Sequence, residues 1–289
     1  MKVNVYTLNS FAKTEEGGNP AGVVMNADSL TETEMRKIAA ILGFSETAFV
    51  MQSNAADVKV RFFTPSEEVD LCGHATIATF YAMSTLGVLK PGRYKQETKA
   101  GILGIEIKED HTIMMNQPVP VFAERIEKEE IADSLHIKTA EMLEDLPIQI
   151  VSTGLRDIIV PIKSIQILNA IKPDMEKIKK ISQKYNVVGY HAFSLESVQG
   201  ACANCRNFAP LYDIPEESAT GTSNGALGCY LYQYEKINEK QASNIILEQG
   251  YSMKKPSEIL VSLRTKGKEI IEVKVGGIAK KLVQSEIVL

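Results

Sequence analysis

The sequence predicts an α+β protein of two similar lobes, each a curved, mainly antiparallel β-sheet wrapped around one central α-helix. Three observations lead to this fold class. The chain resembles itself at about half its length, and each half contains one helix that is apolar almost all round. The strands around these helices are short and alternate between apolar and polar residues. A helix without a polar face must be buried, and alternation is typical of strands with one buried face.

The internal duplication rests on four matches that recur in the same order. Only two copies are present, and their spacing is far longer than that of solenoid repeats. The matches are Met35-x-Lys37-Ile38-x-x-Ile41 with Met175-x-Lys177-Ile178-x-x-Ile181, Gly43-Phe44 with Gly189-Tyr190 (followed by Ala48-Phe49 and Ala192-Phe193), Arg61-x-Phe63-x-Pro65 with Arg206-x-Phe208-x-Pro210, and Gly73 then Ala78 with Gly221 then Ala226.

Each copy is expected to run in the order helix, strand, strand, glycine turn and buried helix. Thr31-x-x-Glu34 is a capping box for the first helix. Lys266-Gly267 and Gly276-Gly277 are hairpin signals. The expected lobes are residues 1–117, joined by the C-terminal strand at about 280–289, and residues 118–279.

The composition excludes several classes of function. The chain has 289 residues, 44% of them hydrophobic, and a formal net charge of −4 with no basic stripe. A nucleic-acid partner needs such a stripe, so none is expected. No run approaches the ~20 apolar residues of a membrane span, and the first residues lack a signal peptide's apolar core. We therefore expect a cytoplasmic protein without a membrane partner.

The two glycine turns predict an anion-binding site. Gly73 and Gly221 each precede a buried helix, whose N-terminus presents unpaired N–H groups and a partial positive charge. Such a place holds a carboxylate well. If the lobes are related by a pseudo-twofold axis, both turns would clamp one substrate between them. The alternative is that these glycines only permit close packing.

Acidic and imidazole side chains near these turns are candidates for proton transfer. Glu46 lies in an otherwise apolar stretch, where partial desolvation raises a carboxyl pKa toward neutrality. His74 follows Gly73 directly and could donate to a substrate oxygen. Glu217 precedes the second turn, and Thr222 follows Gly221. The alternative is an exposed glutamate and a histidine that only packs or caps a helix.

The pair Cys202-x-x-Cys205 is a weak signal for a metal or redox site. It has no second cysteine pair and no histidine at zinc-finger spacing. It runs into the strand that contains Arg206, so packed thiols are the favoured interpretation.

Motifs along almost the whole chain resemble the PhzF-like family, which is named for an isomerase of phenazine biosynthesis. The resemblance implies a diaminopimelate-epimerase-like fold, a homodimer, and catalysis without a metal or an organic cofactor. The motifs are Gly18-Asn-Pro-Ala-Gly-Val-Val, Ser45-Glu-Thr-Ala-Phe-Val, Arg61-Phe-Phe-Thr-Pro, Glu68-Val-Asp-Leu-Cys-Gly-His-Ala-Thr, Ser152-Thr-Gly, Arg206-Asn-Phe-Ala-Pro, Ala219-Thr-Gly and Gln249-Gly250.

The resemblance also implies roles for matching positions. Glu46 is similar to the family's proton-transferring glutamate. The other positions are expected to bind substrate: Asn19, Gly73, His74, Glu217, Gly221 and Thr222. Glu217 stands where an aspartate is usual, and Thr222 where a serine is usual, so the substrate need not be that of the named isomerase.

We therefore expect a cofactor-independent isomerase that moves a proton on a small carboxylated metabolite. Related racemases use two cysteines, one before each glycine turn; here Cys72 fills the first place and Thr220 the second. A threonine is a far weaker acid than a thiol, which disfavours that chemistry. The alternatives are an epimerase that uses Glu46 with Cys72, and a non-catalytic protein that binds a small molecule.

Overall fold

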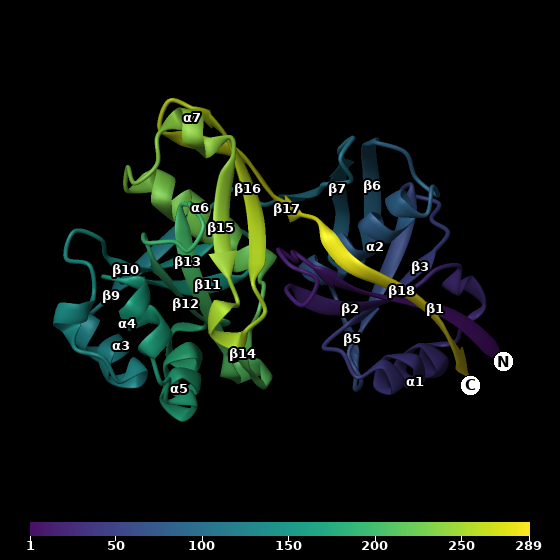
Figure 1. Cartoon of the computed structure of the whole chain (residues 1–289), viewed down its shortest axis with the longest axis horizontal. Helices are drawn as coiled ribbons and strands as arrows, with labels where there is room; N and C mark the ends of the chain where they lie inside the picture. Colours follow the sequence, from purple (N-terminus) through teal and green to yellow (C-terminus); the bar gives the residue numbers. More distant parts are fainter. The chain divides into compact units, whose positions relative to one another are not determined.

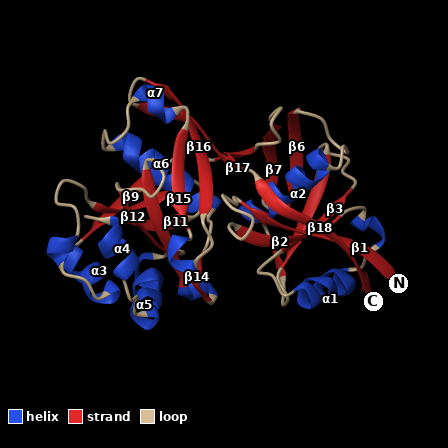
Figure 2. Cartoon of the chain, viewed as in Figure 1, coloured by secondary structure: helices blue, strands red, loops and turns tan.

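A computed structural model describes the whole chain, residues 1–289, and it divides into two compact units. The first unit contains residues 1–116 together with 276–289, and the second contains residues 117–275. Strands predominate over helices in both (Figure 2). The last strand, yellow in Figure 1, runs beside the purple first strand, so both chain ends belong to the first unit.

The first unit consists of short strands around one long helix, with a second helix on the outside. Its elements are β1 (Lys2–Ser10), β2 (Asn19–Val24), α1 (Glu32–Leu42), β3 (Thr47–Met51), β4 (Val58–Phe63), β5 (Glu68–Val69), α2 (Gly73–Thr85), β6 (Gly92–Thr98), β7 (Gly101–Ile107), β8 (Ile113–Gln117) and β18 (Ala279–Val288).

The second unit repeats this order and adds helices on its outer side. Its elements are β9 (Val121–Ile126), α3 (Lys128–Leu135), β10 (Ile148–Ser152), β11 (Arg156–Ile162), α4 (Ile165–Ala170), α5 (Met175–Tyr185), β12 (Gly189–Ser194), β13 (Ala203–Ala209), β14 (Ile214–Glu217), α6 (Gly221–Gln233), α7 (Glu239–Ala242), β15 (Ile245–Gln249), β16 (Ser257–Lys266) and β17 (Glu269–Gly277).

Strand pairing shows the duplication directly. β2 pairs parallel with β3, and β11 pairs parallel with β12. The next pairs, β3–β4 and β12–β13, are antiparallel, and β4–β6 and β13–β15 are parallel. Each unit has one further strand beside its first pair: β18 pairs with β1, and β9 pairs with β10.

The central helices α2 and α6 are buried along almost their whole length, as the sequence predicts. Helix α2 packs against β1, β2 and β3, and α6 packs against β10, β11 and β12. Each has 13 residues and begins with glycine. Because the sheet surrounds each helix, residues all round it can be apolar without exposure to water.

The outer face of the second unit's sheet is covered by α3, α4 and α5, which gather on one side in Figure 1. Their buried side chains, such as Leu135, Leu168 and Ile178, pack on residues of β10 to β13. In the first unit α1 alone does this, through Met35, Ile38 and Ala39.

An arginine–glutamate pair recurs at the same place in both units. Arg61 contacts Glu68 with N–O distances of 2.7 and 2.8 Å, and Arg206 contacts Glu216 with distances of 2.9 and 2.8 Å. The guanidinium carbons lie 5.0 Å from the Phe63 ring centroid and 4.9 Å from that of Phe208. The Arg-x-Phe motif therefore fixes the strand before each glycine turn.

The capping box at the start of α1 is confirmed. The Thr31 N–H donates to Glu34 Oε2 at 2.8 Å, and the Glu34 N–H donates to Thr31 Oγ1 at 3.3 Å. The hairpin at Lys266-Gly267 is confirmed as well, since it joins β16 to β17.

Two details of the sequence interpretation are wrong. Gly276-Gly277 is not a hairpin turn, because both residues lie in β17 and a Cβ at Gly276 would stand 2.0 Å from Ile113 O. Gly43 ends α1 with φ 67°, whereas Gly189 begins β12, so these glycines are not equivalent. The residue in the place of Gly43 is Asn186, which ends α5 with φ 50°.

These two glycines predict different costs for the same substitution. A Cβ at Gly189 would lie 1.9 Å from the backbone oxygen of Phe208, so Gly189→Ala must push β12 from β13. We expect a loss of about 3 kcal/mol in the free energy of unfolding. In Gly43→Ala the new Cβ meets nothing within 4 Å, so the only cost is that of a left-handed backbone conformation for alanine. Its expected cost is about 1 kcal/mol. Urea unfolding measures both, and equal losses would contradict the close approach.

Candidate functional site

Glu46, Cys72 and His74 meet at the start of α2. Glu46 immediately precedes β3, Cys72 is the N-cap residue of α2, and His74 is the second helical residue. His74 Nε2 lies 3.3 Å from Glu46 Oε2, and Cys72 Sγ lies 3.4 Å from His74 Nδ1. The exposed fraction is 17% for the Glu46 side chain and 6% for that of His74. The His74 imidazole thus lies between a carboxylate and a thiol, in a largely buried position.

Backbone contacts with the first two strands hold this group in position. The buried Ser10 hydroxyl, at the end of β1, donates to the His74 carbonyl oxygen at 2.6 Å. The Gly22 N–H of β2 donates to the Glu46 carbonyl oxygen at 3.4 Å. Asn19 is buried at the start of β2, directly opposite Ser10. The structure therefore brings Glu46 and His74 into contact and places Asn19 one strand away.

The second glycine turn carries a different set of side chains. Glu217 ends β14, and Thr220 is the N-cap residue of α6. The Thr220 hydroxyl donates to Glu217 Oε2 at 2.5 Å. Gly221 and Thr222 are the first two helical residues, and the Thr153 hydroxyl donates to the Thr222 carbonyl oxygen at 3.2 Å. Glu217, Gly221 and Thr222 are thus gathered at one turn of the second unit.

Gln249 is a residue of this turn to which the sequence assigned no role. Its amide nitrogen donates to the Glu217 carbonyl oxygen at 2.7 Å and to Thr220 Oγ1 at 3.1 Å. Its amide oxygen accepts from the Thr220 N–H at 3.2 Å and from Asn224 Nδ2 at 2.7 Å. The only sequence signal for it was the Gln249-Gly250 motif. A side chain at Gly250 would stand 2.6 Å from Ser218 O, so this glycine allows the strand to approach the turn.

A buried carboxyl lies behind the second turn. Asp157 Oδ2 accepts a 2.8 Å hydrogen bond from the Ser223 hydroxyl, while its Oδ1 has no hydrogen-bond partner. Burial, with a smaller contribution from the charge of Glu217, raises the pKa of Asp157 to about 7, although the hydrogen bond from Ser223 lowers it. Nearby His191 is also fully buried, and burial lowers its pKa to about 4. His191 is therefore neutral at pH 7, whereas Asp157 exchanges its proton near this pH.

Neither central helix has a side chain that caps its N-terminus. By contrast, side chains cap α1, α4, α5 and α7, through Thr31, Ser164, Asp174 and Asn238. At α6 the capping position holds Thr220, but its hydroxyl is directed to Glu217 instead. Uncapped N–H groups at the end of a helix favour an anion.

The pair Cys202 and Cys205 agrees with the interpretation as packed thiols. All four cysteines are free thiols. Cys205 is fully buried in β13, and burial raises the pKa of its thiol well above the ordinary value. Of the groups that could hold a metal, Glu46, Cys72 and His74 stand out, because their ligand atoms lie within 4.8 Å of one another.

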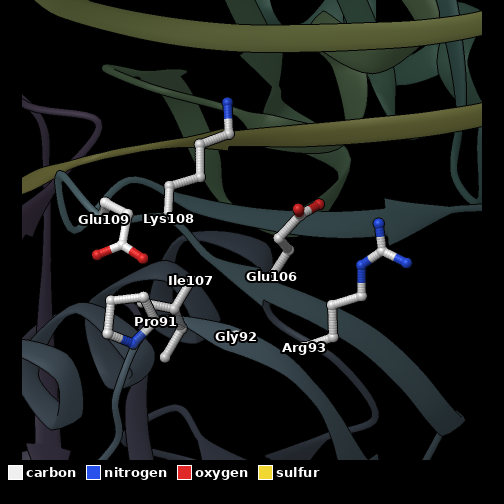
Figure 3. A pocket seen from close by; sticks show the side chains of 7 residues that line it. All are labelled: Pro91, Gly92, Arg93, Glu106, Ile107, Lys108 and Glu109. Carbon is white, nitrogen blue, oxygen red and sulfur yellow. The ribbon is translucent and has the colours of Figure 1, made fainter.

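The hairpin of β6 and β7 carries a hollow that contains none of the predicted site residues (Figure 3). Its charged side chains are two basic and two acidic ones, Arg93, Lys108, Glu106 and Glu109. It lacks the excess of one charge that would select an ionic ligand. Separately, no helix is long and apolar enough to cross a membrane.

Comparison with protein families and relatives gives consistent matches over the full chain. The family described as "Phenazine biosynthesis-like protein" (PhzC-PhzF) matches residues 8–285. An uncharacterized isomerase of Clostridium acetobutylicum is 38% identical, covering 100% of this chain and 99% of the relative. The trans-2,3-dihydro-3-hydroxyanthranilate isomerase of Pseudomonas chlororaphis is 28% identical over 93% of this chain and 94% of the relative.

Solved structures confirm the fold class. The crystal structure of a Bacillus anthracis phenazine biosynthesis protein of the PhzF family has a TM-score of 0.89 and 33% identity, covering 100% of both chains. A hydroxyproline epimerase from Agrobacterium vitis has a TM-score of 0.62 and 11% identity, covering 99% of this chain and 91% of the epimerase. The second likeness shows the shared epimerase-like fold alone.

Asp157 predicts a pH-dependent stability. The folded state keeps its proton up to pH 7, whereas an unfolded aspartate loses it near its ordinary pKa of 3.8. The free energy of unfolding should therefore fall as pH rises between these values and stay level above pH 7. Asp157→Asn has no proton to lose, so from pH 5 to pH 8 it should gain about 2 kcal/mol relative to the native protein.

Urea unfolding at both pH values measures this difference. Asp213→Asn is the matched control, because the Asp213 side chain is 96% exposed. A pH-independent difference between Asp157→Asn and the native protein would rule out a buried protonated carboxyl.

Proposed function

Because the chain belongs to the PhzC-PhzF family, whose curated relatives are named isomerases, we propose that it moves a proton on a small carboxylated metabolite. The chain is an isomerase of this family. In the proposed mechanism Glu46 is the general acid and base. The single observation that supports this assignment is the contact between Glu46 Oε2 and His74 Nε2 at 3.3 Å.

The proposed reaction needs only one proton-carrying side chain. The Glu46 carboxylate takes a proton from a carbon next to the substrate's carboxylate or a conjugated carbonyl, and the electron pair shifts along the substrate. The same carboxyl then returns the proton to another carbon, so the product is an isomer of the substrate. His74 orients the carboxyl and can donate to a substrate oxygen on which negative charge develops. The low exposure of both side chains keeps water from competing for the proton.

Substrate binding is assigned to the glycine turns. The N–H groups at the start of a helix without a side-chain cap would hold the substrate carboxylate, beginning at Gly73 in α2 and at Gly221 in α6. Asn19, His74, Glu217 and Thr222 would supply the remaining polar contacts. That both turns bind one substrate molecule, and that the protein is a homodimer, stay predictions.

The names of two relatives suggest the first compound to test. Trans-2,3-dihydro-3-hydroxyanthranilate carries a carboxylate and is the substrate for which the Pseudomonas isomerases are named. In this chain Glu217, one CH₂ longer than the usual aspartate, would displace any contact to that compound by ~1 Å, a shift large enough to lower the rate strongly. A related carboxylated metabolite is therefore the proposed substrate class.

Cysteine-assisted epimerisation is a second candidate, and one contact favours it. The 3.4 Å distance from Cys72 Sγ to His74 Nδ1 would let the imidazole accept the thiol proton and leave a nucleophilic, basic thiolate. In that mechanism Cys72 and Glu46, whose donor atoms lie within 4.8 Å of each other, would serve the same substrate carbon. Loss of α-proton exchange in Cys72→Ser would favour epimerisation, and full exchange would favour the Glu46 mechanism.

Glu46→Gln tests the proposed mechanism. Glutamine keeps the shape but cannot carry the proton, so turnover should fall at least about 100-fold. The assay follows deuterium incorporation from D₂O into trans-2,3-dihydro-3-hydroxyanthranilate and related carboxylic acids by NMR. Glu97→Gln is a control, because Glu97 belongs to the same unit but contacts Ser53 and Lys59. Full turnover by Glu46→Gln on any substrate found would refute the mechanism.

Thr220→Val tests whether Glu217 is held for substrate binding. The substitution removes the hydroxyl that donates to Glu217 Oε2. We expect the substrate KM to rise about tenfold with a smaller change in kcat, as for loss of a hydrogen bond to a charged group. Thr265→Val removes a threonine–glutamate hydrogen bond on the surface of the same unit and should leave both constants unchanged. An unchanged KM in Thr220→Val would exclude Glu217 from binding.

A further inference from the structure

The start of α2 gathers three side chains whose donor atoms differ in chemical softness. Glu46 offers a carboxylate oxygen, His74 an imidazole nitrogen and Cys72 a sulfur atom. His74 Nε2 lies 3.3 Å from Glu46 Oε2 and 3.9 Å from Cys72 Sγ. All three donor atoms lie within 4.8 Å of one another. They come from two separate segments, which hydrogen bonds join to β1 and β2.

These spacings fit a tetrahedral transition-metal ion. With metal–ligand distances of about 2.0 Å to nitrogen or oxygen and 2.3 Å to sulfur, neighbouring ligand atoms stand about 3.3–3.6 Å apart. The pair of His74 Nε2 and Glu46 Oε2 already has this spacing, and that of His74 Nε2 and Cys72 Sγ needs a shift of a few tenths of an ångström. The third pair, Glu46 oxygen and Cys72 Sγ, lies within 4.8 Å and needs a side-chain shift of up to about 1 Å. Thiolate with imidazole and carboxylate is a donor set for Zn²⁺ rather than for Mg²⁺ or Ca²⁺.

We propose that Glu46, Cys72 and His74 form a binding site for Zn²⁺ and similar thiophilic divalent cations. On binding, the Cys72 thiol releases its proton to solvent and its sulfur bonds the metal, while His74 and Glu46 each donate a lone pair. Three protein ligands leave a fourth position for water or a carboxylate. The binding itself does not depend on the proposed isomerase mechanism.

Inhibition is the functional consequence, and this part rests on the proposed function. The cation would occupy the Glu46 oxygen and the His74 nitrogen that proton transfer requires. Zn²⁺ should therefore inhibit turnover reversibly, and a chelator should restore it. Protons compete for the same lone pairs, so binding should weaken as pH falls.

The pair Cys202 and Cys205 is the competing place for such a cation. Cys205 is fully buried within β13, which disfavours its thiolate. Cys202 is only partly buried and follows a loop. Cys202→Ser therefore serves as the matched control for Cys72→Ser.

Cobalt(II) is the probe, because its bond to a thiolate gives a charge-transfer absorption band in the near ultraviolet. Titration of the full-length protein with Co²⁺ should produce this band, and Zn²⁺ should displace it. Cys72→Ser should abolish the band, and Glu46→Gln should weaken Co²⁺ binding at least about tenfold. Cys202→Ser should leave both unchanged. No band in the native protein, or loss of the band in Cys202→Ser alone, would overturn the proposal.

Alkylation of the native protein gives a test without any variant. Zn²⁺ should slow the reaction of Cys72 with iodoacetamide and leave that of Cys202 unchanged, as measured by peptide mass spectrometry. Equal protection of both cysteines, or none, would contradict the site. A Co²⁺ band together with full turnover by Glu46→Gln would refute the isomerase mechanism and leave the metal site standing.

Discussion

Burial of two helices that have no polar face is the constraint on which the rest of the structure depends. Helices α2 and α6 are enclosed by strands, so the residues at their first turns are fixed by the sheet and not by solvent. In α2 this places His74 under the Ser10 hydroxyl and against Glu46. In α6 it places Thr220 between Glu217 and Gln249. The groups proposed for chemistry are therefore located by the same contacts that bury the helices.

The two turns have diverged in what they carry. The first presents a thiol, an imidazole and a carboxylate in mutual contact. The second presents a carboxylate that accepts from a hydroxyl, on a residue whose backbone carbonyl oxygen accepts from an amide, near a buried carboxyl whose pKa is raised. The duplicated scaffold is the same, including an Arg–Glu pair before each turn. This division agrees with proton transfer at one turn and substrate positioning at the other.

The sequence was informative wherever a feature is local or repeated. Periodicity located α2 and α6, and the Thr31–Glu34 spacing predicted a capping box that the structure contains. Gly276 was misread because its role depends on Ile113, which is remote in the sequence. Gly189 was misaligned because close approach to Phe208, rather than a helix end, requires a glycine there.

The site was harder to derive than the fold for the same reason. The resemblance selected Glu46 and His74, but residue order alone could not show that they touch. Gln249 and Asp157 belong to strands far along the chain from Thr220 and Ser223, and only tertiary pairing brings them together. Neither residue belongs to a sequence pattern whose spacing would predict its contact with the second glycine turn.

The strand that closes each unit also sets the order in which the chain can fold. Residues 117–275 form one uninterrupted stretch, whereas residues 1–116 lack β18 until the last residues emerge. During synthesis the second unit can therefore complete its sheet before the first, although the first is made earlier. The pairing of Lys2 with Val288 spans almost the whole chain, and contacts of such long sequence separation form slowly. Until they form, the edge of β1 is open to pairing with another chain, and such an open edge favours aggregation.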